Sequence, residues 1–249
     1  MSAYEALAGV YDGLTEDVDY VRRADYIERL FQKSRIPVHT VLDLACGTGT
    51  MTAILTRRGY ELIAVDASAD MLAQAMEKAV DLAGEKPVFL NQSMPELDLY
   101  GTVDAAICCL DSINYLTRPR DVQRTFQRLR LFIAPGGLLV FDINTPCKLQ
   151  GLDGQVWLDE GEDVYCVWRT EFEKRSRLCH YWMDIFTRGE EDVWHRDFEE
   201  HHQRAYEVEE LRRWLEEAGF TQIRTYGDCK MRSPSQQEQR IYFTAVRGK

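Results

Sequence analysis

The chain lacks the signals that direct proteins into membranes or oxidising compartments. None of its 249 residues begin a run approaching the roughly 18 consecutive apolar residues of a membrane span, and no basic stretch followed by an apolar core opens the sequence. Its seven cysteines include no Cys-x-x-Cys pair, and an odd number cannot all pair within one chain. We therefore expect a cytoplasmic protein with reduced cysteines, no membrane association and no metal site.

Positive charge is scarce as well. The sequence has 30 Lys and Arg against 41 Asp and Glu, which gives a formal net charge of −11. A chain of this charge is repelled by a phosphate backbone, so we expect no nucleic-acid partner. Hydrophobic residues make up 45% and charged residues 29%, a balance typical of globular rather than disordered proteins. The length suits one α/β domain with an inserted subdomain.

The segment 40–143 alternates short apolar runs with amphipathic helical patterns, which is typical of a parallel sheet covered by helices. The predicted strands span 40–44, 62–65, 88–91, 104–109 and 138–143. A further amphipathic pattern predicts a helix from Val18 to Phe31. After residue 206 the chain returns to helix and strand, with predicted strands at 222–226 and 240–246. One domain is therefore expected to comprise residues 1–150 and 207–249.

Residues 151–206 interrupt this alternation and predict an antiparallel β insert. Its extended segments span 164–172, 178–187 and 193–206, and turn-prone KRSR and RGEED sequences separate them. Four of the five tryptophans and four of the five histidines lie in the insert. Strand alternation puts Arg196, Phe198, Glu200 and His202 on one face and His195, Asp197, Glu199 and His201 on the other. The sequence leaves open which face turns toward the rest of the molecule.

The most informative segment is VLDLACGTGT, where a strand ends at Asp43 and small residues open a helix. Small residues let a ligand touch the backbone, although a tight connection without a ligand is the alternative. No Lys-Ser or Lys-Thr follows the glycines, which disfavours a nucleotide triphosphatase. The Asp43 carboxylate would repel a pyrophosphate, which disfavours a dehydrogenase.

A second acid, Asp66, ends the next strand 23 residues after Asp43. This is close to the spacing at which an acid receives ribose hydroxyls, although a helix N-cap is the alternative for Asp66. Together the two acids and the glycine-rich turn favour a nucleoside with a cationic, phosphate-free tail. S-adenosylmethionine (SAM) has that chemistry.

The segments DLACGTG, VDAS followed by Met71, and NQSMPELDL resemble the motif series of class I SAM-dependent methyltransferases over residues 4–246. The resemblance implies an α/β fold, a Rossmann-like seven-stranded mostly parallel sheet with an antiparallel β insert. The insert resembles that of small bacterial methyltransferases related to sugar-amine and glycine N-methyltransferases. It implies SAM-dependent methyl transfer to N or O of a small molecule. A SAM-binding sensor or assembly protein without methyl transfer is the alternative.

The resemblance also implies a set of cofactor contacts. It places Asp43, Ala45 and Gly47 around the methionine tail, Asp66 on the ribose hydroxyls, Ala67 and Met71 beside the adenine, and Ser93 and Met94 at the adenine edge. It places Leu110 and Asp111 beneath the transferred methyl group, and Tyr11 on a lid formed by the segment AYEALAGVYDGL. The chain departs from many relatives in having Ser93 in place of Asp and Ala45 in place of Gly.

Methyl transfer is an in-line displacement that needs alignment and exclusion of water more than a strong acid. A hydroxyl acceptor would gain from a base, whereas an amine needs only to be held neutral. The candidate catalytic residues are Tyr11, Asn144, Arg196, Glu200 and His202. We expect the insert to form the wall of the acceptor site, and an interface that makes a homodimer is its alternative role.

Overall fold

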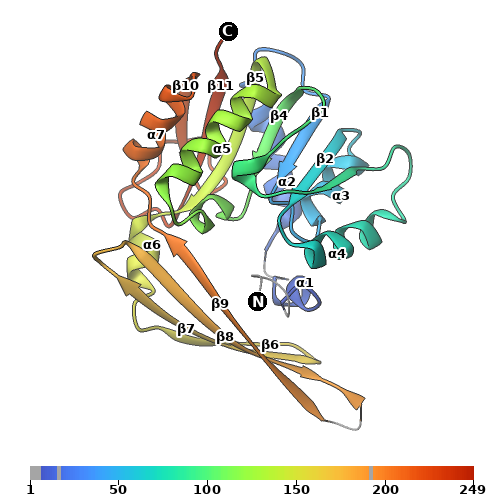
Figure 1. Cartoon of the computed structure of the whole chain (residues 1–249), viewed down its shortest axis with the longest axis vertical. Coiled ribbons are helices and arrows are strands. Elements are labelled where there is room, and N and C mark those ends of the chain that lie inside the picture. The colour runs from blue at the N-terminus through green and yellow to red at the C-terminus, as the bar shows by residue number, and fades with distance from the viewer. Residues whose placement is uncertain (1–6, 16–17, 191–192) are drawn as a thin grey trace.

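The structure, a computed structural model, describes residues 7–15, 18–190 and 193–249 and arranges them around two sheets (Figure 1). In the described residues the larger sheet has seven strands in the order β10-β11-β5-β4-β1-β2-β3. They are β1 (Thr40–Leu44), β2 (Glu61–Asp66), β3 (Val88–Asn91), β4 (Val103–Cys108), β5 (Ile133–Asn144), β10 (Phe220–Gly227) and β11 (Arg240–Arg247). β11 runs antiparallel to both of its neighbours, and the other pairs are parallel. The predicted Rossmann-like fold is confirmed.

Helices cover both faces of this sheet because successive strand residues bury alternately on opposite sides. α2 (Tyr20–Phe31) and α3 (Thr50–Arg57) pack on the face that carries Val41 and Ile107. α5 (Pro119–Phe132) and α7 (Val208–Glu217) pack on the face that carries Leu42 and Cys108. α4 (Ala69–Ala79) lies beside α3. No helix in the described part of the chain is long and apolar enough to cross a membrane.

Local sequence sets where these helices begin. Asp19 is the N-cap of α2, and its carboxylate accepts a hydrogen bond from the Arg22 backbone N–H at 2.9 Å, so the helix starts at Tyr20 rather than at Val18. α5 starts at Pro119, whose missing N–H costs nothing in a first helical turn. Because the first residue of each helix is fixed, the apolar stripes of α2 and α5 face the sheet.

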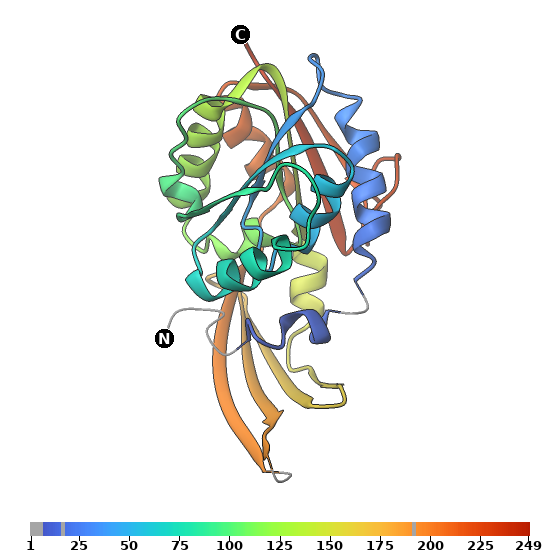
Figure 2. The same cartoon turned by 90° about the vertical axis from the view of Figure 1, so that its right-hand side faces the viewer.

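The insert forms a separate antiparallel sheet in the order β6-β7-β8-β9, which projects from one end of the larger sheet (Figure 2). Its strands are β6 (Val156–Glu160), β7 (Val164–Glu173), β8 (Leu178–Arg188) and β9 (Trp194–Arg204). The sequence predicted three extended segments here and missed both β6 and the preceding α6 (Pro146–Gly151). β6 is a short edge strand with no fully buried position, so its hydrophobic signal is weak.

The two faces of the insert sheet differ. We call the face that carries Cys166, Met183 and Ile185 the inner face, because these buried side chains pack against Leu7 and Tyr11. The opposite, outer face carries Trp182 and Glu200, which lie opposite each other on β8 and β9.

Residues 7–15, which we call the lid segment, lie at the junction of the two sheets (Figure 2). They include the short helix α1 (Tyr11–Leu14). The Asp12 carboxylate accepts hydrogen bonds from the Thr48 hydroxyl at 2.6 Å and from the Lys78 ammonium at 2.7 Å. The lid segment therefore joins the inner face of the insert to the glycine-rich turn. Residues 3–6 of the expected lid and residues 191–192 of the expected RGEED turn lie outside the described residues.

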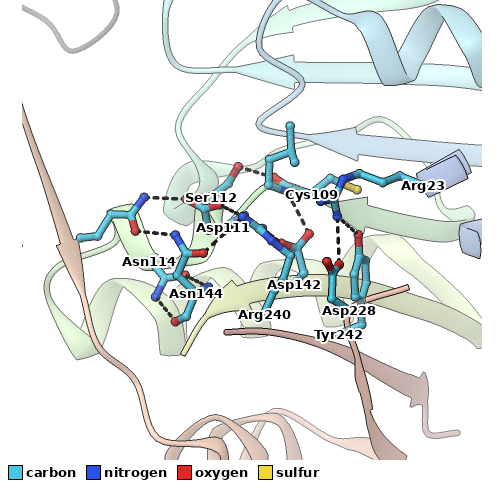
Figure 3. Close-up of polar contacts among 12 residues, drawn as sticks. Arg23, Cys109, Asp111, Ser112, Asn114, Asp142, Asn144, Asp228, Arg240 and Tyr242 are labelled. Carbon is cyan, nitrogen blue, oxygen red and sulfur yellow. Dashed lines mark hydrogen bonds and ion pairs between the residues drawn. The ribbon is translucent and has the colours of Figure 1, made fainter. Parts of the chain in front are cut away.

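A side-chain amide fixes the place where the insert leaves and rejoins the core. Asn114 donates from Nδ2 to the backbone oxygen of Asn144 at 3.0 Å and to that of Arg204 at 2.9 Å. Asn144 ends β5 and Arg204 ends β9. One buried amide thus holds the outgoing and returning chain together, and Figure 3 shows Asn114 beside Asn144.

Candidate functional site

A cavity of about 370 Å³ lies at the carboxyl ends of β1, β2 and β4, which is where open α/β sheets bind ligands. We call it the central cavity. Most of the residues that the resemblance assigned to the cofactor line it, namely Tyr11, Asp43, Ala45, Gly47, Asp66, Ala67, Met71, Ser93, Met94 and Leu110. Asp111 is not among the lining residues. The lid segment contributes Tyr11 to the wall, and burial raises the pKa of its phenol well above the usual value.

The glycine-rich turn reaches the cavity through three left-handed residues. Ala45, Gly47 and Gly49 have φ values of 60°, 56° and 74°. A non-glycine residue in this region pays about 1 kcal/mol, so Ala45 carries strain that a glycine would avoid. At Gly49 a Cβ would lie 2.8 Å from the Cβ of Ala75, so the missing side chain lets α3 and α4 approach closely. The turn therefore presents its backbone to the cavity.

Asp43 and Asp66 bring two carboxyl groups to the same wall. Asp43 is 2% exposed and accepts a hydrogen bond from the Thr52 hydroxyl at 2.6 Å. Burial raises the pKa of Asp43 to about 6, and the neighbouring Asp66 adds to the rise. Burial also raises the pKa of Asp66. A cationic ligand would relieve the cost of ionising both groups, as the sequence suggested.

Hydrogen bonds hold Asp66 at the rim of the glycine-rich turn. Its Oδ2 accepts from the Gly47 backbone N–H and its Oδ1 from the Ser68 N–H, both at 2.8 Å. The N-cap of α4 is Ser68, whose hydroxyl accepts from the Met71 N–H at 3.2 Å. The helix-cap alternative for Asp66 is therefore wrong, and its carboxylate faces the cavity.

Leu110, which lines the cavity, belongs to a strained pair of residues after β4. Leu110 and Asp111 both have left-handed φ values, 55° and 54°. Asp142 accepts hydrogen bonds from both backbone N–H groups, at 2.8 Å and 3.1 Å, and it pairs with Arg240 (Figure 3). This pairing holds Leu110 in the cavity wall. Sequence analysis did not find Asp142 or Arg240, because neither belongs to the motifs that carry the resemblance.

The Asp111 side chain turns away from the cavity, which corrects the expectation that it lies beneath the methyl group. Its Oδ1 pairs with Arg240 at 2.5 Å, and its Oδ2 accepts from the Gln203 amide at 2.5 Å (Figure 3). Although burial opposes ionisation, Arg240 holds the pKa of Asp111 below its usual value. Asp111 therefore contributes an internal ion pair rather than a ligand contact.

A chain of polar side chains connects the insert to the cavity. The buried His201 ring contacts Glu199 through Nε2 at 2.7 Å and the Tyr115 hydroxyl through Nδ1 at 3.3 Å. The second oxygen of Glu199 accepts from the Leu7 backbone N–H at 2.8 Å. Tyr115, in the 3₁₀ turn η2 (Ser112–Tyr115), lines the cavity. With Nε2–H donating to Glu199, Nδ1 accepts the proton of the Tyr115 hydroxyl.

Comparisons with known proteins place this arrangement in a family. A family profile described as "Methyltransferase domain" matches residues 41–137. A protein of Bacillus subtilis (strain 168), named putative methyltransferase YqeM, is 33% identical over 250 residues, covering 99% of this chain and 98% of its own. The chain belongs to the SAM-dependent methyltransferase family. It is an enzyme whose cofactor is SAM.

Two further comparisons identify proteins that are similar to this methyltransferase. The crystal structure of a SAM-dependent methyltransferase from Clostridium acetobutylicum superposes with a TM-score of 0.88 at 29% identity, covering 99% of both chains. The glycine/sarcosine/dimethylglycine N-methyltransferase of Actinopolyspora halophila is 26% identical over 90% of this chain and 39% of its own. The superposition on the Clostridium acetobutylicum structure thus covers the insert as well as the larger sheet.

The side chains that β9 of this methyltransferase turns toward the core are not the catalytic candidates that the sequence suggested. Glu199, His201 and Gln203 are buried on the inner face. Of the sequence candidates, Arg196 pairs with Asp184 on the outer face, and Glu200 accepts from the Trp182 indole at 3.0 Å. His202 lies beside Glu200 on that face. The register of β9 against β8, together with the lid segment, decides this orientation, and neither can be read from one strand's alternation.

Two other placements differ from the expectations. Asn144 is buried at the end of β5, where its Nδ2 donates to the Gln203 side chain at 3.0 Å, so it supports the junction and does not line the cavity. The cavity also uses residues that the sequence missed, among them Tyr20, Thr48 and Gln92. These three lie within a few residues of recognised motifs or elements, which is the only signal that could have found them.

Proposed function

We propose that this methyltransferase transfers the methyl group of SAM to a nitrogen or oxygen atom of a small polar molecule held between the central cavity and the inner face of the insert. The observation that carries the proposal is the chain Glu199–His201–Tyr115, which runs from β9 to the cavity wall. It supplies a proton acceptor at the point where an acceptor molecule would meet the cofactor.

The cavity wall fits SAM by its chemistry. We assign the Asp66 carboxylate to the ribose hydroxyls and the Asp43 carboxylate to the cationic methionine tail, since both acids line the cavity, Asp43 buried and Asp66 partly buried. Ala67, Met71, Ser93 and Met94 form the side available to the adenine. Gly47 of the glycine-rich turn also lines the cavity, so its backbone is available to the ligand, which supports the same orientation of SAM.

SAM supplies a methyl group on a positively charged sulfur when bound. Leu110 and Cys109 give the cavity an apolar floor, and Tyr11 covers it from the lid segment, so these residues exclude water from the reacting atoms. The Tyr115 hydroxyl accepts the proton that the acceptor nitrogen or oxygen loses as it gains the methyl group, and passes its own proton to His201 Nδ1. Glu199 stabilises the resulting imidazolium.

Enclosure and charge support a small acceptor. Tyr11 of the lid segment lines the cavity, and the inner face of the insert packs against the same segment, which favours a small acceptor over a polymer. Residues 151–206 carry 14 acids against 7 Lys and Arg, which disfavours a nucleic acid. Methylation of nitrogen also fits the named activity of the Actinopolyspora halophila relative.

The test incubates the purified chain with methyl-labelled SAM and, separately, with small-molecule, protein and nucleic-acid fractions of a cell extract. It follows label transfer and release of S-adenosylhomocysteine. His201→Gln is expected to lower kcat by about 10²- to 10⁴-fold while SAM affinity stays unchanged, because the ring does not line the cofactor side. His195→Gln, an exposed histidine on the same strand, is the matched control. Tyr115→Phe should show the same split as His201→Gln.

Three results would overturn the proposal. SAM binding without label transfer to any fraction would favour the sensor or assembly alternative. Label transfer only to protein or nucleic acid would exclude a small acceptor. Full activity of His201→Gln together with a change of oligomeric state would make the insert an assembly surface.

A further inference from the structure

The outer face of the insert holds a cluster of two histidines and a glutamate that the proposed methyl transfer does not use. His180 on β8 and His202 on β9 are directly opposite in the antiparallel pair, and their rings meet edge to face with centroids 4.8 Å apart. Glu200 lies on the same face, and its Oε1 is 3.8 Å from the His202 Nε2. One possible ligand atom from each residue lies within 4.8 Å of the other two.

Neighbouring groups orient these side chains toward one another. The Trp182 indole N–H donates to the Glu200 carboxylate at 3.0 Å, and the Trp182 ring stacks on His180 with an interplanar angle of 13°. A hydrogen-bonded carboxylate and a stacked imidazole are restrained before any ligand arrives. Restraint of this kind is what outer-shell partners provide at metal sites.

The histidine on β9 has an unused nitrogen. His202 Nδ1 is shielded from solvent and has no hydrogen-bond partner among the described residues. A buried nitrogen without a hydrogen-bond partner costs free energy. No hydrogen bond at Nδ1 therefore explains the position of the His202 ring.

We propose that His180, Glu200 and His202 form a site for a divalent transition-metal cation such as Zn²⁺, with water completing the coordination. Two imidazoles and one carboxylate are a donor set that zinc uses in proteins. The ligands come from two strands that the folding of the insert brings together, which is why the sequence predicted no metal site. The net charge of −11 favours a cation at any exposed position, but only these groups converge on one point in the described residues.

The geometry needs only a small contraction. Ligand atoms about 2.1 Å from a tetrahedral zinc are about 3.4 Å apart. The Glu200 to His202 separation of 3.8 Å is already close to that value, and the widest pair is within 4.8 Å. Rotation of the partly exposed Glu200 and His202 side chains closes the difference without moving the strands. The cation would link β8 to β9 on the face opposite Glu199 and His201.

Zinc titration of the untagged, chelator-stripped chain by calorimetry tests the site. We expect one equivalent of Zn²⁺ to bind, and His180→Ala or His202→Ala to weaken binding by more than about 100-fold. Trp182→Phe keeps an aromatic ring beside His180 and removes the indole N–H. It should weaken binding by about 10- to 100-fold because Glu200 loses its orienting partner. Co²⁺ in place of Zn²⁺ should give a d–d absorption that both histidine variants abolish.

The matched controls are His195→Ala and His39→Ala, which remove exposed histidines outside the cluster. Both should bind Zn²⁺ like the parent chain. Absence of stoichiometric binding in the parent chain would overturn the proposal. Undiminished binding in a His180→Ala, His202→Ala double variant would also overturn it, since the metal would then be held by other groups such as the exposed Cys147.

Discussion

Replacing Asp43 with asparagine shows how much the buried carboxylate costs in protein stability and how much it contributes to SAM binding. The Asp43 carboxyl is 2% exposed and its hydrogen bond comes from the Thr52 hydroxyl, which an asparagine oxygen can equally accept. The variant therefore keeps the shape and removes the ionisation. It should stabilise the free protein at neutral pH and weaken its binding of SAM.

The pKa of Asp43 sets the size of the first effect. Burial raises it from 3.8 to about 6. The folded state therefore holds a proton that the unfolded state releases between about pH 4 and pH 6, and the free energy of unfolding falls as pH rises through this window. The difference between the folded and unfolded pKa values of Asp43 corresponds to about 3 kcal/mol in the free energy of unfolding. Asp43→Asn should therefore be more stable than the parent chain by about this amount at pH 8, and equally stable at pH 4.

SAM binding should respond in the opposite direction. Losing a hydrogen bond to a charged group costs about 1.5–3 kcal/mol, or roughly 10- to 150-fold in affinity, and Asp43→Asn should weaken SAM by this factor at pH 8. In the parent chain, affinity should fall about fivefold from pH 6 to pH 5, because protonation of Asp43, whose pKa is about 6, removes the anion that pairs with the cationic tail.

Urea unfolding and SAM calorimetry at several pH values make the test. Asp104→Asn is the matched control, because Asp104 accepts from the His39 and Thr40 backbone N–H groups, both at 2.9 Å, at the opposite end of the sheet. It should leave SAM affinity unchanged at every pH. If Asp43→Asn and the parent chain have parallel stability profiles from pH 4 to pH 8, the burial argument is refuted. If SAM affinity is unchanged, the assignment of Asp43 to the cationic tail is refuted.

Three other perturbations test the site. Asp66→Ala should weaken SAM by roughly 10- to 150-fold in calorimetry while exposed Asp70→Ala has no effect, and equal affinities would remove Asp66 from the ribose site. Arg240→Ala leaves two buried carboxylates unpaired and should cost about 3–5 kcal/mol in urea unfolding, against little for exposed Arg224→Ala; comparable stabilities would contradict the role of the ion pairs. Hydrogen exchange in residues 7–15 should slow when SAM or S-adenosylhomocysteine binds, and unchanged protection would argue against a lid.

The core and the cofactor side of the site were largely predictable because local signals coincide there. Alternation of apolar runs with helical stripes gives the order of the parallel strands. The turn after β1 and the acids that end β1 and β2 lie at strand ends, and strand ends of a parallel sheet share one edge. Proximity of Asp43 and Asp66 in the cavity wall thus follows from chain order alone.

The acceptor side could not be predicted because long-range packing decides it. The sequence EEHH places Glu and His on both faces of β9, so the pattern is the same whichever face turns inward. The lid segment covers the face with Glu199 and His201, and this contact joins residues almost two hundred positions apart. Arg240 reaches Asp111 across 129 positions, and no local motif marks Arg240.

The amide of Asn114 gives the molecule a thermodynamic property as well as a shape. It bonds both the strand end from which the insert departs and the strand end by which it returns, so the insert cannot detach from the larger sheet without exposing a buried polar group in the core. Melting of either sheet should therefore entail melting of the other. Differential scanning calorimetry should show a single cooperative transition in which calorimetric and van't Hoff enthalpies agree. Asn114→Ala should divide it into two.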